Sequence, residues 1–196
     1  MSARIDQPKH NQDGDRRVER TRMALREAFN RLILSEGYDA LSAAKIAAEA
    51  NVGRSTFYEH YRGKDDMLTH SLVPLLLPFA DTVFQKGDDL RLLAVVEHFW
   101  TNRKMARRVM ADGAYTVISN TLADLIAERL EERVFSRLSH KAMLPPALTA
   151  IQIAQCQLTL IQEWLTGRHG CSAIEIATAL KTISHAITNA VVLKTT

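Results

Sequence analysis

Residues 46–68 read IAAEANVGRSTFYEHYRGKDDML, and this stretch decides the fold of the N-terminal part of the chain. Two short segments with apolar residues at helical spacing flank the tripeptide Asn51-Val52-Gly53. Asn is one of the few residues besides glycine that tolerate a left-handed backbone, which a turn between two helices requires. The stretch therefore predicts a helix-turn-helix, a motif that places its second helix in the major groove of DNA.

A longer helix is predicted to precede this motif. Its apolar side chains recur at the spacing of one helical face: Leu25, Ala28, Phe29, Leu32 and Ile33. Gly37 is expected to end this helix, and Ser42 to cap the next one. Phe57 and Tyr61 lie four residues apart and are assigned to the core of the three helices, together with Phe29, Ile46 and Val52.

The charge of the chain is uneven. Residues 16–64 hold 10 Lys and Arg against 6 Asp and Glu, whereas the 132 residues after Lys64 hold 13 of each. A basic N-terminal segment on a neutral body favours a polyanionic partner. Ordinary scatter of surface charge is the alternative. The positions of the basic residues in the fold have to decide between the two.

The run 46–68 resembles the N-terminal signature of the TetR family of bacterial transcriptional regulators. The resemblance rests on Ile46-Ala47, the turn with Val52, the segment from Thr56 to Tyr61, and Lys64 to Leu68. It extends over about residues 16–68, and it implies an all-α protein. A three-helix DNA-binding domain (16–63) would follow a flexible arm (1–15) and precede a larger helical domain for effector binding and dimerisation (64–196).

Within the motif, Arg54 is the expected reader of base edges, because its fork can bond guanine O6 and N7. Thr56 and Tyr58 offer hydroxyls to phosphate oxygens, and Lys64 offers a point charge. The predicted DNA-binding residues are Ser42, Ala44, Lys45, Arg54, Ser55, Thr56, Tyr58, His60 and Lys64. Each has a plainer interpretation: Tyr58 as a cover of the core, His60 as a surface residue, Lys64 as a solvated charge. Their common register favours the functional one.

The remainder of the chain reads as helices over 64–85, 89–100, 103–110, 113–138, 146–167 and 172–193. The first is expected to bend at Pro74 or Pro78, because each proline removes a backbone donor. If a ligand displaces this helix, the two recognition helices of a dimer move relative to each other.

The last two helices carry broad apolar faces, and helices of this kind pair across a two-fold axis in proteins of the TetR family. Residues 160–165 also resemble the penultimate helix of one C-terminal subtype. The dimer candidates are Ile151, Ala154, Leu158, Ile161, Leu165, Ile176, Leu180, Ile183 and Ile187. Alternatively, both faces belong to the core of a single chain.

By the same resemblance, residues 65–138 enclose a ligand cavity. The candidate lining residues are Phe79, His98, Phe99, Trp100, Met105, Met110, Tyr115, Gln162 and Trp164. Plain core packing is the alternative for each of them. The basic residues Arg103, Lys104, Arg107 and Arg108 form either an anion site or a solvated face.

Other classes find little support. Nucleotide-binding, hydrolase and metalloprotease motifs are missing, so the chain is not expected to be an enzyme and no cofactor is expected. Cys156, Cys171 and His169 fall short of a closed metal site. The sequence has no secretory signal and no membrane-length apolar run, and it looks cytoplasmic.

The expected function is thus a homodimeric, DNA-binding repressor released from a palindromic operator by a small molecule. An activator or DNA-organising protein without a ligand is the alternative, and a helical interaction protein that has lost DNA binding is a third.

Overall fold

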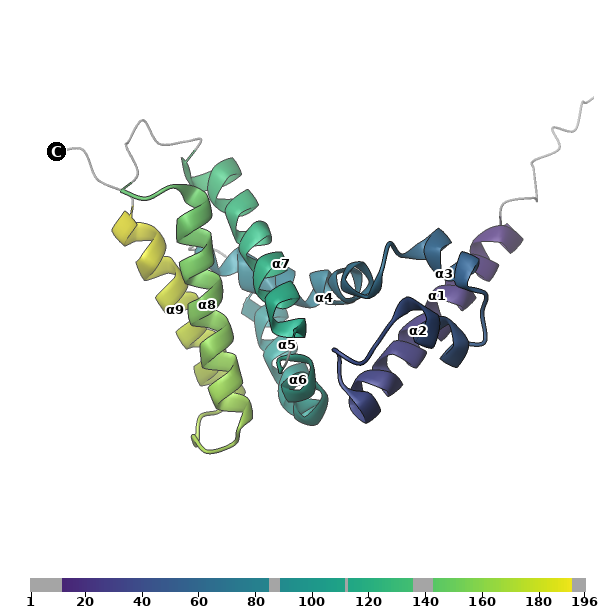
Figure 1. The fold of residues 1–196 in the computed structure, drawn as a ribbon. Helices are drawn as coiled ribbons and strands as arrows, with labels where there is room; N and C mark the ends of the chain where they lie inside the picture. Colours follow the sequence, from purple (N-terminus) through teal and green to yellow (C-terminus); the bar gives the residue numbers. More distant parts are fainter. Residues whose placement is uncertain (1–11, 85–88, 112, 136–142, 192–196) are drawn as a thin grey trace, which may run out of the picture.

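The computed structural model describes residues 12–84, 89–111, 113–135 and 143–191, and all regular elements in these ranges are helices (Figure 1). The all-α fold is confirmed. The elements are α1 (Gln12–Glu36), α2 (Ala43–Glu49), α3 (Arg54–His60), α4 (Lys64–Ala80), the 3-10 turn η1 (Asp81–Val83), α5 (Asp89–Thr101), α6 (Arg103–Val109), α7 (Ala114–Arg129), the π-helical turn η2 (Leu130–Phe135), α8 (Pro146–Leu165) and α9 (Ala173–Val191). In these ranges no helix is long and apolar enough to cross a bilayer.

The three N-terminal helices fold as their sequence predicts. The apolar stripe of α1 is buried from Leu25 to Ile33, and Phe57 and Tyr61 lie in the same core. Asn51 has a φ of 54° and Gly37 a φ of 85°, so both turns use the left-handed backbone expected of them. Ser42 caps α2 through a hydrogen bond from the Lys45 amide (3.3 Å).

α1 begins at Gln12, four residues inside the segment predicted as an arm. Residues 1–11 of that segment lie outside the described residues.

Two of the later helices are shorter than predicted. The helix expected over 64–85 ends at Ala80, within a turn of Pro78, which has no N–H to donate to the carbonyl four residues before it. It includes both prolines, and the chain then tightens into η1. The helix expected over 113–138 becomes a π-helical turn after Arg129, and residues 136–138 lie outside the described ranges.

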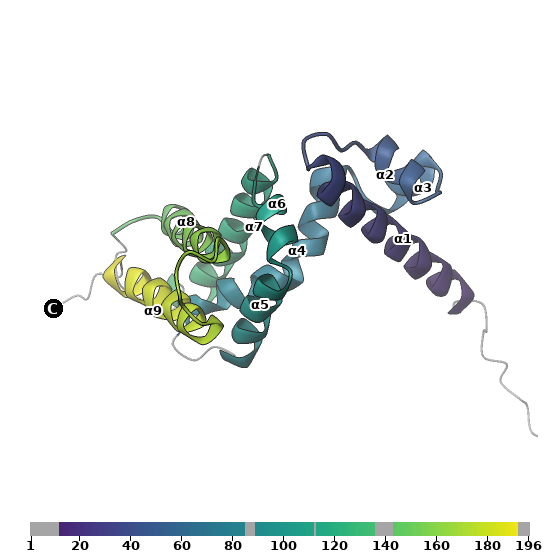
Figure 2. The same cartoon turned by 90° about the horizontal axis from the view of Figure 1, so that it is seen from below.

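The larger domain is organised around α7, which packs on α4 and α8. α8 and α9 lie at the end of the molecule farthest from α1–α3, and α4 runs between the two domains (Figures 1 and 2). The buried amide of Gln157 donates to Thr82 Oγ1 and Ser184 Oγ, each at 2.8 Å. It therefore ties α8 to η1 and to α9.

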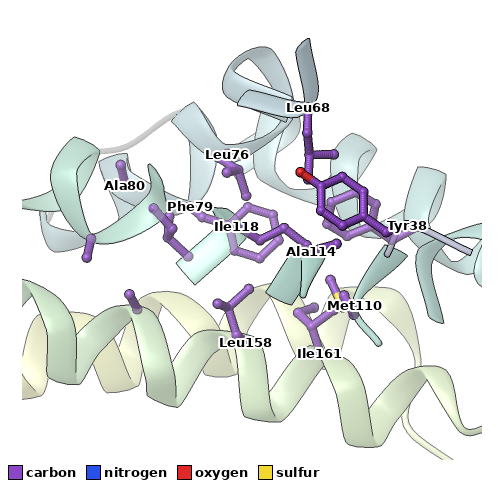
Figure 3. Packing of buried hydrophobic residues seen from close by; sticks show 14 of the residues in the cluster. Tyr38, Leu68, Leu76, Phe79, Ala80, Met110, Ala114, Ile118, Leu158 and Ile161 are labelled. Atoms are coloured by element: carbon purple, nitrogen blue, oxygen red, sulfur yellow. The ribbon is translucent and has the colours of Figure 1, made fainter. Parts of the chain in front are cut away.

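The junction between the domains centres on Tyr38, in the loop after α1. Its ring is buried, meets the Phe29 ring edge-on, and lies beside Leu68 and Ala114 of the larger domain (Figure 3). The phenol donates a hydrogen bond to the carboxylate of Asp65 in α4. Burial raises the pKa of Tyr38 far above its usual value, so the phenol stays protonated and continues to donate.

Two polar contacts complete the junction. The Asp39 carboxylate accepts from the amide of Gly113 (3.2 Å), at the start of α7. The Arg108 guanidinium of α6 donates to the carbonyl of Ile33, near the end of α1 (3.4 Å). The buried Tyr38 ring, its hydrogen bond to Asp65 and these two contacts between side chains and backbone thus join the N-terminal domain to the larger one.

The Tyr38–Asp65 hydrogen bond predicts a measurable loss in the variant Tyr38→Phe. Removal of the hydroxyl keeps the packed ring and is expected to lower the free energy of unfolding by about 1 kcal/mol. Urea denaturation at neutral pH measures it. Tyr58→Phe is the control, because the Tyr58 side chain is on the surface and makes no hydrogen bond with described residues. Equal stability of the two variants would contradict the assignment.

Candidate functional site

The outer face of α3 carries the strongest candidate residues for binding DNA. Phe57 and Tyr61 anchor the helix in the core, and Arg54, Ser55 and Tyr58 are exposed on its other side. Within the described part of the chain, the Arg54 guanidinium pairs with no carboxylate and makes no hydrogen bond. A cation that the protein leaves free at the start of a helix is available to an external acceptor.

Tyr58 is 53% exposed, and its ring packs edge-on against Phe57 with centroids 5.5 Å apart. The buried neighbour thus orients the phenol while its hydroxyl faces solvent. Thr56 and His60 are partly buried beside it. α3 therefore presents a guanidinium, hydroxyls and an imidazole from one short rigid helix, which is a suitable set for base edges and phosphates.

The candidates before α3 are less free than the sequence suggests. Ser42 is occupied as a helix cap, and Ala44 is half-buried. The Lys45 ammonium forms an ion pair with Glu36 of α1 at 2.7 Å. Lys45 has to exchange this partner before it can contact a phosphate.

Lys64 differs most from the prediction. Its ammonium donates to the carbonyl oxygens of Tyr38 (3.1 Å) and Asp39 (3.4 Å), and it lies 4.5 Å from the centroid of the Tyr38 ring. The side chain therefore holds the loop after α1 in place. A hydrogen-bond partner 26 residues earlier leaves no signal in the local sequence, so sequence reasoning missed this role.

A cavity of about 350 Å³ lies where α1 meets α4, α5 and α6, and we call it the junction cavity. Its wall is mostly apolar, with polar groups at an exposed rim. The lining residues on α1 are Arg26, Phe29, Asn30 and Ile33; those on α4 are Leu68, Ser71, Leu72, Leu75 and Leu76; those on α5 to α7 are His98, Phe99, Asn102, Met105, Ala106, Val109, Met110 and Ile118. The volume and the apolar wall suit a small-molecule site.

Residues 25–70 match the model of the family described as bacterial regulatory proteins, tetR family. A curated relative, the uncharacterised HTH-type transcriptional regulator YxbF of Bacillus subtilis (strain 168), is 42% identical over 55 residues. These cover 28% of this chain and 14% of that protein, so the chain matches only a small part of this relative. The N-terminal part of the chain, residues 25–70, is therefore similar to the N-terminal domain of the TetR family.

Two solved structures share the fold of this chain over most of its length. A TetR transcriptional regulator from Streptococcus agalactiae 2603V has a TM-score of 0.56 at 22% identity, over 89% of this chain and 99% of that one. A TetR-family regulator of Syntrophomonas wolfei str. Goettingen has a TM-score of 0.55 at 15% identity, over 87% and 96%. The likeness extends beyond the helix-turn-helix into the larger domain.

The residues predicted to line a TetR-type cavity divide into two groups. His98, Phe99, Met105 and Met110 line the junction cavity. The others lie outside it: Phe79, Trp100, Tyr115, Gln162 and Trp164. The Trp100 and Trp164 rings stack on each other with centroids 4.8 Å apart, and Gln162 donates to the Met110 carbonyl. Tyr115 bonds to Gln155 of α8 (2.6 Å). These contacts are structural packing.

The junction cavity draws part of its wall from α1, whose residues the sequence had assigned only to the DNA-binding domain. The apolar period of α1 explains Phe29 and Ile33 equally well as core residues of three helices. The apolar periodicity of the sequence could therefore not predict a cavity between the two domains.

The dimer prediction requires a correction. Six of the nine candidates are buried within the single chain: Ala154, Leu158, Ile161, Leu165, Ile176 and Leu180. Leu158 points toward Ile118, and Ile161 toward Met110 (Figure 3). These six are core residues of the single chain, in which α8 packs on α7 and α9 packs on α8, α5 and η1. Ile151, Ile183 and the half-buried Ile187 stay candidates.

Among the described residues, the cysteines form no metal site and the basic residues of α6 form no single anion site. Cys156 is partly buried, Cys171 is exposed, and His169 faces Glu163 at 3.6 Å. Among the described residues no three side chains are placed to hold a metal ion. Arg103 lies over the Trp100 ring (5.2 Å) and Arg108 bonds to α1, so the basic residues of α6 are not one anion site.

The contacts of Lys64 predict that the variant Lys64→Met is less stable by about 1 kcal/mol, since it loses two hydrogen bonds and a cation–π contact. Lys45→Met is the control, because an exposed ion pair contributes little to stability. Thermal unfolding of both variants measures the difference. If Lys64→Met keeps the wild-type stability, these contacts do not stabilise the fold and Lys64 stays a candidate for binding phosphate.

Proposed function

We propose that this chain is a homodimeric repressor that binds a palindromic DNA site through α3 and leaves it when a small molecule occupies the larger domain or its junction. One observation carries the DNA-binding part: α3 is anchored by Phe57 and Tyr61, and Arg54 on its outer face has no partner among the described residues. A rigid helix with a free guanidinium fits the major groove, where a bidentate contact reads guanine.

Dimerisation is supported by the apolar residues left uncovered at the far end of the molecule. Leu148 and Ile151 are exposed on α8, and Ile183 is 37% exposed on α9. Exposed aliphatic side chains on two adjacent helices are suited to a second copy, because such a patch is costly in water. A two-fold dimer presents two recognition helices, which matches a palindromic site.

Release by a ligand is supported by the position of the junction cavity. The cavity has walls in both domains, so an occupant contacts α1 and α4–α6 together. A ligand changes DNA affinity only when it binds the two conformations differently, and coupling of this kind is typically about 1–3 kcal/mol. Repression follows from occupancy, because a bound dimer excludes other proteins from the same DNA.

Selection of bound sequences from random DNA tests the proposal most directly. We expect two-fold symmetric sites with half-site centres about one helical turn apart, or a multiple of it. Asymmetric sites, or no enrichment at low salt, would contradict it.

The variant Arg54→Ala is expected to cost about 1–3 kcal/mol of DNA-binding free energy per half-site and to relax the preference at one base position. The comparison is Arg168→Ala, which removes the same charge from an exposed side chain between α8 and α9, far from α3. Fluorescence anisotropy on the selected site and on single-base variants measures both. If the two variants bind every sequence alike, Arg54 does not read a base.

The variant Ile183→Glu is expected to dissociate the dimer in sedimentation while its helical circular dichroism persists. Ile174→Glu is the matched control on α9: Ile174 is exposed and, nine residues earlier, lies about 180° around the helix. A dimer that survives Ile183→Glu would place the interface elsewhere.

A further inference from the structure

We propose that two adjoining hollows at the domain junction form one site for an amphiphilic anion, with its apolar chain in the junction cavity and its charged head beside Arg22 and Arg26 of α1. The inference rests on the ligand-responsive part of the proposed function and names the chemical class of the ligand.

The second hollow, which we call the arginine hollow, has a volume of about 430 Å³. Its lining residues are Glu19, Arg22, Arg26, His60, Tyr61, His70 and Ser71. Arg26 and Ser71 also line the junction cavity, so the two spaces share a wall. The proposed ligand lies across both spaces, with its alkyl chain and its head on either side of Arg26 and Ser71.

The two spaces differ in chemistry in the way that an amphiphile does. The junction cavity is walled by leucine, phenylalanine, methionine, valine and isoleucine side chains. An alkyl chain that lies there is removed from water, and this burial favours binding. The arginine hollow is lined by charged and hydrogen-bonding groups instead.

The charges favour an anionic head over a cationic one. Two guanidinium groups face the arginine hollow against one carboxylate, Glu19, which already pairs with Arg26 at 3.0 Å. A second carboxylate, Asp66, stands behind His70 at 3.6 Å. The rim of the junction cavity offers Asn30, His98 and Asn102 and no carboxylate. A cationic head would thus meet two arginines, and the one carboxylate that lines the arginine hollow, Glu19, is already paired with Arg26.

Two further groups are able to serve the head. Burial raises the pKa of Tyr61, so its phenol stays protonated and can donate. His60 is the last residue of α3, so a head group in the arginine hollow sits against the end of the recognition helix. The site therefore contacts α1, α3 and α4–α6, and its occupant bridges the surface proposed for DNA and the larger domain.

Calorimetry on the chain of 196 residues without DNA tests the assignment. The three probes share one alkyl chain and differ in the head: decanoate, 1-decanol and decyltrimethylammonium. We expect decanoate to bind about tenfold more tightly than decanol, because a charge-assisted hydrogen bond adds to the same apolar burial. The cation is expected to bind most weakly. Equal affinities for the three probes would overturn the proposal.

Variants on α1 test whether the charged head of the probe lies beside Arg26. Arg26→Gln should weaken decanoate about tenfold and leave decanol unchanged. Glu19→Gln should strengthen decanoate binding, because it removes the competing carboxylate and releases Arg26. Arg20→Gln is the matched control, since Arg20 is exposed on the same helix and lines neither hollow. If Arg26→Gln and Arg20→Gln bind decanoate equally, the head lies elsewhere.

A variant of α6 tests whether the alkyl chain of the probes lies in the junction cavity. Ala106 is partly buried in the wall of the junction cavity, so Ala106→Phe introduces a ring there and should abolish binding of both decanoate and decanol. Retained binding by a folded Ala106→Phe protein would overturn the location. If that variant unfolds, the opposite shifts expected for Arg26→Gln and Glu19→Gln decide the matter.

DNA affinity is measured on separate samples with the selected site. Decanoate binding without any effect on DNA refutes the coupling and leaves the site standing. Normal DNA binding by a protein that ignores all three probes refutes this site and leaves the DNA-binding proposal intact.

Discussion

The burial of one phenol ring organises the molecule. Tyr38 comes from the loop that leaves α1, yet its ring packs beside residues of α4 and α7, and its hydroxyl bonds to Asp65. Lys64 closes over the same ring and bonds to the two carbonyl groups beside it. The start of α4 is therefore fixed to the end of α1, and the position of α2 and α3 relative to the larger domain follows from that attachment.

Local physics made the N-terminal domain predictable. A left-handed Asn51, a serine cap at Ser42 and the apolar stripe of α1 all depend on neighbours within a few residues, and each took the expected form. The α8–α9 faces were harder, because an apolar stripe is equally satisfied by its own chain or by a second copy. Ala154 and Leu158 are buried within their own chain, whereas Ile151 is exposed. The partner of Lys64 depended on tertiary contact alone.

The cations of the N-terminal domain differ in whether a carboxylate of the same domain pairs with them. Lys45 pairs with Glu36, and Arg31 pairs with Glu49, so two cations on or near α2 are compensated internally. Arg54 on α3 has no such partner among the described residues. Arg54 therefore differs from Lys45 and Arg31, whose charges already face a carboxylate of the same domain.

Two glycines at the junction set how freely this chain can vary. A Cβ on Gly37 would lie 2.8 Å from a guanidinium nitrogen of Arg108, at a φ of 85° that other residues rarely adopt. A Cβ on Gly113 would lie 2.5 Å from the Asp39 carboxylate and displace the oxygen that its own amide binds. A side chain at either position would therefore have to push aside Arg108 or Asp39, the two residues whose side chains join the domains here. The cost of such a change would fall on the junction between the domains and not on the segment that carries the new side chain.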